Sequence, residues 1–235
     1  MKKSFIVRLL LLPLLLLCVL NTTYASAHQN IHRHNTQANQ ILLATPKTVQ
    51  ENHKPKASVG VVLYTHNAAR EIFLLIGQEV DGKKDAGTYC ELGGSAELDQ
   101  SGKPESFVTG AIRECHEESA RIYQLDPDYV LSNGYTYYNI TPTGREEVYI
   151  FLKAPKYVPV SDLIHATAKQ KEDKYKEKAN FKWAKLSDLL ACSEGKCNVY
   201  DIEGKQEEIV LRSFFHKTLH SPKILEIIQS ISAHE

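Results

Sequence analysis

Residues 91–122 read ELGGSAELDQSGKPESFVTGAIRECHEESARI, and the second half of this stretch has the spacing of an amphipathic helix. We expect that helix to run from Pro104 to about Ile122, because the missing N–H of a proline would be unpaired in a first turn anyway. At about 100° per residue, Glu114, Glu117 and Glu118 share one face of it. Another face gathers apolar side chains, namely Val108, Ala111, Ile112 and Cys115.

Three carboxylates on one helix face repel one another, at a cost of roughly 0.2–0.5 kcal/mol per pair. A bound divalent cation would reverse that sign, and oxygen ligands without His or Cys select a hard ion, Mg²⁺ or Mn²⁺. A solvated acidic helix face is the alternative. The neighbours favour a metal site: Arg113 sits among the acids, Glu105 lies upstream, and Gly93-Gly94 end a predicted strand where a backbone carbonyl can approach a metal.

The pattern resembles the Nudix signature, which reads G, five residues, E, seven residues, R-E, an aliphatic, any residue, E-E, any residue, G and an aliphatic. Glu105, seven residues and then Arg113–Glu118 match its second half, and Gly94 looks like its opening glycine. The resemblance covers roughly residues 57–192, including the segment Trp183–Leu186. It implies an enzyme, a pyrophosphohydrolase that cleaves a diphosphate linkage, and an α/β (α+β mixed) fold in which helices sandwich a mixed sheet.

The chain departs from that signature at three places. Ten residues separate Gly94 from Glu105, where the family has five. This insertion lies in the loop before the helix, beside the implied metal site, where extra length costs little entropy. Ala120 stands for the second glycine of the signature and Arg121 for its last aliphatic residue. Since alanine lacks the freedom of glycine to adopt a positive φ, we expect the helix to continue past Ala120.

The resemblance assigns roles to the charged residues. It implies that Mg²⁺ is held by Glu114, Glu117, Glu118 and the carbonyl of Gly93. It implies that Arg113 and Glu105 pair to brace the loop against the helix. Metal ions neutralise the charge of a diphosphate, orient it and lower the pKa of a bound water. One carboxylate then serves as general base, Glu114 within the helix or alternatively Glu172 or Glu177 further along the chain.

The substrate is less constrained than the reaction. Tyr137 and Tyr138 follow Arg121 at a spacing similar to that of the Nudix branch that hydrolyses dinucleoside polyphosphates, where an aromatic ring can stack on a base. The alternative is that these are ordinary strand residues that pack a sheet face. ADP-ribose, sugar nucleotides and non-nucleotide diphosphates are further alternatives, as is a Nudix-fold binding module with little turnover.

The rest of the chain predicts strands before and after the central helix. The expected strands are Ser58–Tyr64, Ile72–Val80, Thr88–Leu92, Tyr129–Ile140, Glu146–Leu152 and Phe181–Leu186. A short helix is expected from Leu186, and two more close the chain, one over Lys205–Leu219 and one that begins at Pro222 with Ser221 as its N-cap. These extra C-terminal helices lie partly outside the region of resemblance.

The N-terminus reads as a secretory signal peptide over residues 1–27. It has a basic start, a short apolar run over Leu9–Leu20 and the small residues Ala25-Ser26-Ala27. Cleavage would remove three positive charges from a chain of net charge zero. We therefore expect a periplasmic or secreted protein, a flexible linker over residues 28–55 and one domain over residues 56–235. A mildly acidic mature chain predicts no nucleic-acid partner, and after cleavage no membrane partner is expected.

Four cysteines remain after that cleavage, an even count that permits disulfides in an oxidising compartment. Cys192 and Cys197 flank a Ser-Glu-Gly-Lys turn, so we expect them to be bonded. Cys90 and Cys115 form a second candidate pair, although Cys115 on the apolar helix face also fits a plain core residue.

Overall fold

The computed structural model describes residues 36–46 and 57–233. The predicted signal peptide, residues 1–27, lies outside the described residues, as does much of the predicted linker, residues 28–55. Within that linker the structure shows a helix over residues 36–43 in place of flexible chain.

The helix over residues 36–43 has a packing explanation. It ends on the apolar run Ile41-Leu42-Leu43, in which Leu42 is fully buried. Just after it, the carbonyl of Ala44 accepts a hydrogen bond of 3.2 Å from the backbone amide of Phe107. The segment around this short apolar run is polar, so its composition predicts a flexible linker and not a helix.

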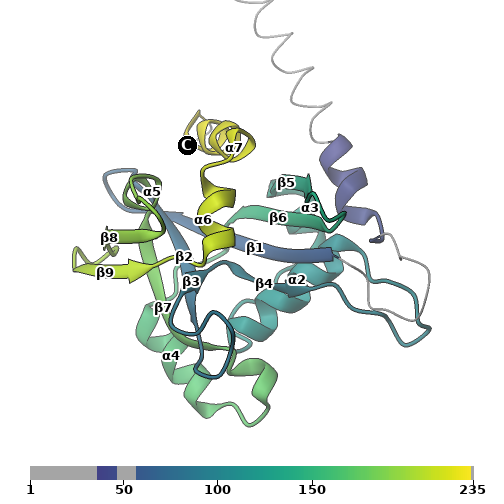
Figure 1. Ribbon diagram of the computed structural model, residues 1–235, viewed down its shortest axis with the longest axis horizontal. Coiled ribbons are helices and arrows are strands. Elements are labelled where there is room, and N and C mark those ends of the chain that lie inside the picture. The colour runs from purple at the N-terminus through teal and green to yellow at the C-terminus, as the bar shows by residue number, and fades with distance from the viewer. Residues whose placement is uncertain (1–35, 47–56, 234–235) are drawn as a thin grey trace, which may run out of the picture. The chain divides into compact units, whose positions relative to one another are not determined.

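A mixed sheet carries the domain, as the sequence predicts (Figure 1). Its strands are β1 (Ala57–His66), β2 (Ile72–Glu79), β3 (Tyr89–Cys90), β4 (Leu92–Ser95), β5 (Tyr135–Ile140), β6 (Glu146–Lys153) and β7 (Lys178–Lys185). The order is β3-β2-β1-β6-β5, with β4 also on β1 and β7 also on β2. β1 and β6 run parallel, and the other pairs run antiparallel. Strands buried on both faces explain the nearly continuous apolar runs of β1 and β6.

One face of the sheet packs against α2 (Phe107–Glu118) and α4 (Val160–Lys169). Val59 on β1 faces α2 so closely that a β-carbon at Gly110 would stand 2.9 Å from its Cγ2 atom. Further along the same face, the fully buried Trp183 donates its indole N–H to the carbonyl of Val158, just before α4, at 2.9 Å. These contacts fix α2 over the strands that lead into the carboxylate region.

The opposite face of the sheet packs against α6 (Ser213–Leu219), α7 (Pro222–Ala233) and a two-stranded hairpin. Val62 and Tyr64, which alternate with Val59 along β1, enter this second core together with Phe215 of α6 and Ile224 of α7. Alternation along the strand therefore divides the sheet into two cores with helices on both sides, which is the predicted sandwich.

α2 is shorter at both ends than the sequence predicts. It begins after Ser106, whose hydroxyl accepts a hydrogen bond of 3.1 Å from the amide of Thr109, so the cap and not Pro104 sets the start. At the other end Ala120 and Arg121 adopt positive φ values of 52° and 71°. The expected continuation past Ala120 is wrong. A left-handed conformation costs a non-glycine residue about 1–2 kcal/mol, which the burial of Ala120 and the contacts around it offset.

Of two further predicted elements, one changes and one is confirmed. The first half of the expected strand Tyr129–Ile140 is a helix, α3 (Pro127–Asn133), because Asp126 caps it through a 3.0 Å hydrogen bond from the amide of Tyr129 and Pro127 stands in its first turn. The short helix expected from Leu186 is confirmed as α5 (Leu186–Leu190). α4 and a single turn of 3-10 helix, η1 (Asp173–Tyr175), occupy the Lys-rich stretch before β7.

The predicted helix Lys205–Leu219 is only half helical. Its first part is β9 (Gln206–Val210), which pairs with β8 (Lys196–Tyr200), and only α6 follows the prediction. The reversal between the strands is closed by Asp201, whose carboxylate accepts a hydrogen bond from the amide of Lys205 and whose carbonyl accepts one from the amide of Gly204. Gly204 adopts a φ of 80°. This local turn chemistry outweighs helical spacing. α7 follows Ser221 as predicted, with the serine hydroxyl accepting from the amide of Ile224.

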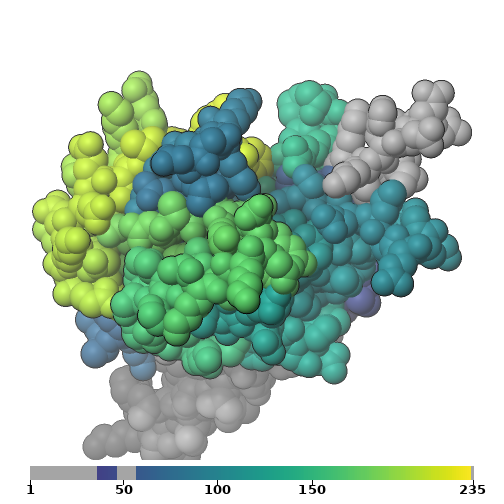
Figure 2. Space-filling view, turned by 90° about the horizontal axis from the view of Figure 1, so that it is seen from below, coloured from purple at the N-terminus to yellow at the C-terminus, as the bar shows by residue number. Residues whose placement is uncertain are grey.

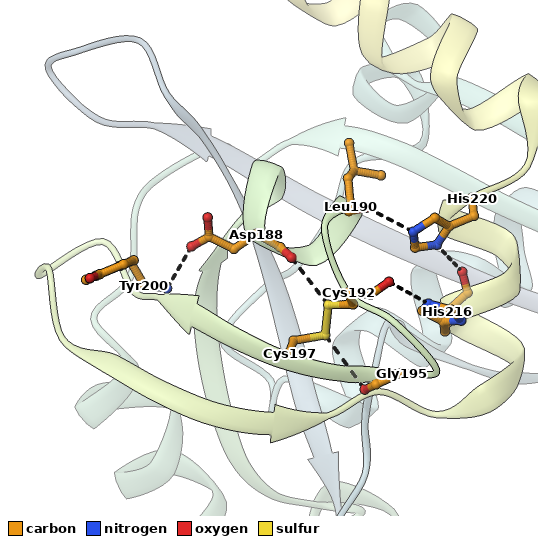
Figure 3. The surroundings of a disulfide bond; sticks show 8 residues. All are labelled: Asp188, Leu190, Cys192, Gly195, Cys197, Tyr200, His216 and His220. Atoms are coloured by element: carbon orange, nitrogen blue, oxygen red, sulfur yellow. Dashed lines mark hydrogen bonds between the residues drawn. A yellow bond between two sulfur atoms is a disulfide. The ribbon is translucent and has the colours of Figure 1, made fainter.

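The predicted disulfide between Cys192 and Cys197 is present, with a Cα–Cα distance of 4.8 Å (Figure 3). It lies at the base of the β8–β9 hairpin, where Nε2 of His216 from α6 lies 3.4 Å from the carbonyl oxygen of Cys192. Cys90 and Cys115 are buried free thiols, so the second candidate bridge is wrong. Within the described part of the chain, no helix has the length and apolar character needed to cross a bilayer.

Candidate active site

The three glutamates of α2 lie at its C-terminal half and are largely withdrawn from solvent. The side chains of Glu114, Glu117 and Glu118 are 10%, 15% and 3% exposed. The helix therefore does not present them as a solvated acidic face. Burying carboxylates is costly unless each finds a partner, so the contacts of these groups identify the site.

β4 meets this helix face through two glycines. The amide of Gly93 donates a hydrogen bond of 2.6 Å to Oε2 of Glu118. Gly94 is packed against Glu114: a β-carbon at residue 94 would stand 2.5 Å from Oε1 and 2.7 Å from Oε2 of that carboxylate. Glycine is therefore required at residue 94 for the carboxylate of Glu114 to occupy its place against the strand.

Arg113 braces the loop before the helix, as the resemblance implies. Its guanidinium donates to both carboxylate oxygens of Glu105, at 2.8 and 3.3 Å, and to the carbonyl of Ser95 at 3.0 Å. Its remaining nitrogen donates to Glu114 at 2.9 Å and to Glu117 at 3.2 Å. Burial alone would lower the pKa of Arg113, but these carboxylates outweigh burial and raise it. Arg113 thus ties the loop, the strand and two site carboxylates together.

The insertion between Gly94 and Glu105 closes on itself. The carbonyl of Glu97 accepts a hydrogen bond of 3.0 Å from the amide of Glu105, and the amide of Glu97 donates to the carboxylate of Glu105 at 2.8 Å. Further out, Asp99 and Lys103 join through a backbone hydrogen bond of 2.7 Å. The extra residues therefore form a pinched loop, a loop closed at its base by the hydrogen bonds between Glu97 and Glu105. These hydrogen bonds position Glu105 whatever the length of the loop beyond them.

Two of the buried carboxyls have raised pKa values. Burial raises the pKa of Glu114 to about 7, with further contributions from Glu117 and Glu177 that the charge of Arg113 opposes. Burial likewise raises the pKa of Glu118 to about 8, with Glu114 and Glu79 adding to it and Lys178 opposing it. Each carboxylate would be easier to ionise next to a further cation.

Lys178 is a site residue that the sequence did not single out. Its side chain is fully buried, and its ammonium lies 2.6 Å from Oε1 of Glu79 and 3.1 Å from Oε1 of Glu118. Gly77 makes the space for it, because a β-carbon there would stand 2.8 Å from the lysine side chain. Several lysines precede it in a polar segment, so composition gives no signal.

The two loop glutamates named as alternative bases separate in space. Glu177 lies close enough to Glu114 to raise its pKa, and it forms an ion pair with Lys83. Glu172 is exposed and pairs with Arg121 at 2.8 Å, beyond the C-terminal end of α2. Of the two, Glu177 belongs to the carboxylate region.

The segment between α4 and β7 lies against α2. Lys174 of this segment donates to Oε1 of Glu117 at 3.0 Å. In Figure 2 this green surface lies beside the teal surface of α2 and the loop before it. The segment therefore borders the carboxylates through Lys174.

The two tyrosines point to different faces of β5. Tyr137 is 6% exposed and stacks on Tyr149 within the core under α6 and α7, with ring centroids 6.2 Å apart. Tyr138 is partly exposed, meets Phe107 edge-on and donates its hydroxyl to Glu146 at 3.0 Å. The predicted substrate role of Tyr137 is corrected, because a ring buried in this core is not open to a nucleotide base.

The side chains that could bind a metal ion are the carboxylates of Glu114, Glu117 and Glu118. Within residues 36–46 and 57–233, no three His, Cys, Asp or Glu side chains converge closely enough to count as a formed metal-binding group. Instead, the carboxylates contact Arg113, Lys174 and Lys178. The chemistry fits a hard cation nevertheless, since the donors are buried carboxylate oxygens whose mutual repulsion the cationic side chains partly balance.

Comparison with known proteins gives similarity to solved structures only. No family model and no curated protein matches the chain. The MutT protein from Methanosarcina mazei Go1 is similar over 78% of this chain and 98% of its own, with 14% identity and a TM-score of 0.40. An Ap4A hydrolase binary complex from C. elegans is similar over 76% of this chain and 99% of its own, with 15% identity and a TM-score of 0.42. A MutT/nudix family protein from Enterococcus faecalis is similar over 77% and 70% of the two chains, with 15% identity and a TM-score of 0.41.

Proposed function

We propose that this chain is a Nudix-type pyrophosphohydrolase that uses Mg²⁺, or Mn²⁺ in its place, to cleave a diphosphate linkage. One observation carries the proposal. Arg113 holds Glu105, Glu114 and Glu117 together, while Gly94 admits the carboxylate of Glu114 to the edge of β4. A helix face that served only solubility would have no reason to bury its acids around one arginine and two glycines.

The residues of the chain divide the work of such a site. Glu114, Glu117 and Glu118 would hold the metal, with the carbonyl of Gly93 as an additional donor. The ion would supply charge neutralisation of the phosphates and acidify a water. Arg113 and Glu105 hold the loop in place against the helix.

Proton removal from the attacking water falls to a carboxylate. Glu114 is the base that we favour: burial raises the pKa of its carboxyl to about 7 without metal, and a bound cation would lower it and favour the ionised form. Glu177, close to Glu114, is the alternative base. Exclusion of bulk water from these buried groups strengthens their effect on developing charge.

For the substrate we propose a nucleoside-diphosphate-type compound. The narrower preference for dinucleoside polyphosphates depended on Tyr137 and Tyr138, and Tyr137 lies in the core. We further propose that the protein is exported, because residues 1–27 have the pattern of a signal peptide and Cys192–Cys197 is bonded.

A Mg²⁺-dependent screen of the purified protein tests this function. The panel contains dinucleoside polyphosphates, ADP-ribose, sugar nucleotides and non-nucleotide diphosphates, with release of phosphorylated products as the readout. Hydrolysis of one class, abolished by a chelator and restored by Mg²⁺, supports the proposal. Binding without turnover would point to the second candidate, a binding module, which the pairing of Glu117 with Lys174 and of Glu118 with Lys178 favours.

A further inference from the structure

Three cationic side chains touch the glutamates of α2, and they are held very differently. Arg113 is also bonded to Glu105 and Ser95, and Lys178 is fully buried against Glu79. Lys174 is 48% exposed and reaches the carboxylates only through Oε1 of Glu117, at 3.0 Å. An exposed single ion pair of this kind is weak. Lys174 is therefore the one cation of the three that can leave at small cost.

The backbone around Lys174 is anchored by its neighbours, while its exposed ammonium touches the carboxylate of Glu117 and lies 4.9 Å from the centroid of the Tyr175 ring. The neighbouring Tyr175 is 7% exposed, and the guanidinium of Arg121 lies 4.0 Å from the centroid of its ring. Gln170 donates its side-chain amide to the carbonyl of Ala120 at 3.1 Å. These contacts hold the segment against the end of α2. A lysine on a fixed backbone with a flexible stem can change partner without any movement of the loop.

We propose that Lys174 is a phosphate-binding residue of this site, and that occupation of Glu117 by a metal ion frees it for that role. The proposal rests on the proposed function. It follows from competition for one atom. Oε1 of Glu117 accepts a hydrogen bond from the ammonium of Lys174, and a divalent cation that binds the same oxygen would displace this ammonium. Once displaced, the ammonium remains beside the metal site, where the negative charge of a diphosphate would lie.

Lysine suits such an exchange. Its ammonium is a compact point charge with three donors on a four-carbon stem, so it can bind phosphate oxygens from several directions. In the metal-free protein the same charge partly neutralises Glu117. Lys174 would thus compete with the metal and cooperate with the substrate. A residue that merely holds the structure together would do neither.

The test compares Lys174→Met, Lys174→Arg and the control Lys171→Met, which removes the same charge from an exposed position of the same segment. Two binding curves are measured: the Mg²⁺ dependence of thermal unfolding, and the affinity for methylenediphosphonate in saturating Mg²⁺, a probe that cannot be hydrolysed at its bridge. KM and kcat are then measured on whichever substrate the wild-type protein hydrolyses.

Lys174→Met should lower the Mg²⁺ concentration for half-maximal stabilisation, because the competing cation is gone. It should also weaken methylenediphosphonate binding and raise KM by about tenfold or more, as expected for the loss of one charge-assisted hydrogen bond. Lys174→Arg should restore most of the probe affinity, and Lys171→Met should match the wild type.

The outcomes separate this proposal from the proposed function. A wild-type enzyme that hydrolyses diphosphates, with Lys174→Met unchanged in metal and probe affinity, overturns the role of Lys174 alone. A wild-type protein without hydrolysis whose probe binding depends on Lys174 supports the role and removes the proposed turnover. A parallel loss of metal and probe affinity in Lys174→Met marks a structural residue and overturns the proposal.

Discussion

Gly94 lies directly against the carboxylate of Glu114, so closely that a β-carbon on Gly94 would stand 2.5 Å from Oε1. The crowded atom is the far end of a flexible side chain, which can move aside. We expect Gly94→Ala to fold with a loss of at most about 1 kcal/mol. Because Glu114 would be displaced by about an ångström, turnover should fall on the order of a hundredfold. Urea unfolding and kcat measured together decide this, with Ser95→Ala as control, and a variant that keeps full activity would contradict the assigned place of Glu114.

Glu117→Gln keeps the size of the side chain and removes one charge. Without metal, its stability should change by only a few tenths of a kcal/mol, roughly the scale of helix-face charge pairs. Its gain in melting temperature on Mg²⁺ addition should be smaller than that of the wild type, and turnover should drop by about a hundredfold or more. Glu226→Gln, an exposed substitution on α7, is the matched control. An equal Mg²⁺ response and equal activity in Glu117→Gln and the control would leave the metal site without support.

The stabilisation by Mg²⁺ should depend on pH. Burial raises the pKa of Glu114 to about 7 and that of Glu118 to about 8, above the ordinary value of 4.5. Raised carboxyl pKa values stabilise the metal-free fold fully below the unfolded pKa, and this contribution is lost as pH rises through the folded values. A metal ion binds the ionised form and releases protons. The gain in melting temperature on Mg²⁺ addition should therefore grow between about pH 6 and about pH 8.5. A gain that stays constant over that range, measured by calorimetry, would argue against these buried carboxyls as ligands.

The disulfide should contribute to stability through the hairpin that it closes. Loss of a bridge over so short a loop is expected to cost about 2 kcal/mol. The double variant Cys192→Ser/Cys197→Ser should unfold at lower urea, and reductant should bring the wild-type protein to the same midpoint while leaving the variant unchanged. Peptide mass mapping without reduction should find the two cysteines linked. Two freely alkylated thiols in the native protein would refute the bond.

Export should leave a defined new N-terminus. Cleavage after Ala25-Ser26-Ala27 would make His28 the first residue of the mature chain. N-terminal sequencing of protein recovered outside the cytoplasm checks this. Recovery there with Met1 intact would exclude a cleaved signal, and Ala27→Arg, which places a large charged residue at the cleavage site, should block processing.

The candidate site could be predicted where the residue types and their helical spacing point to the same arrangement. Helical spacing predicts Glu114, Glu117 and Glu118 on one face. The structure sets Glu118 against Gly93 and Glu114 against Gly94, while Glu117 contacts Arg113 and Lys174. The pairing of Arg113 with Glu105 is confirmed.

Elsewhere the deciding contacts are distant in sequence. Lys178 meets Glu79 across 99 positions, which no local pattern reveals. Ala120 adopts a conformation disfavoured for its residue type, since the packing around the end of α2 outweighs local preference. Residues Gln206–Val210 form a strand and not the predicted helix, because the hydrogen bonds of the preceding turn compete with helix formation.

The pinched loop between Glu97 and Glu105 has a practical consequence. Since hydrogen bonds at its base already hold Glu105, the tip around Asp99 to Lys103 is mechanically separate from the carboxylates. Exposed tips of this kind accept foreign sequence well. A fluorophore, an affinity tag or a short epitope could therefore be inserted there to report on the protein without disturbing the hydrogen bonds that hold Glu105.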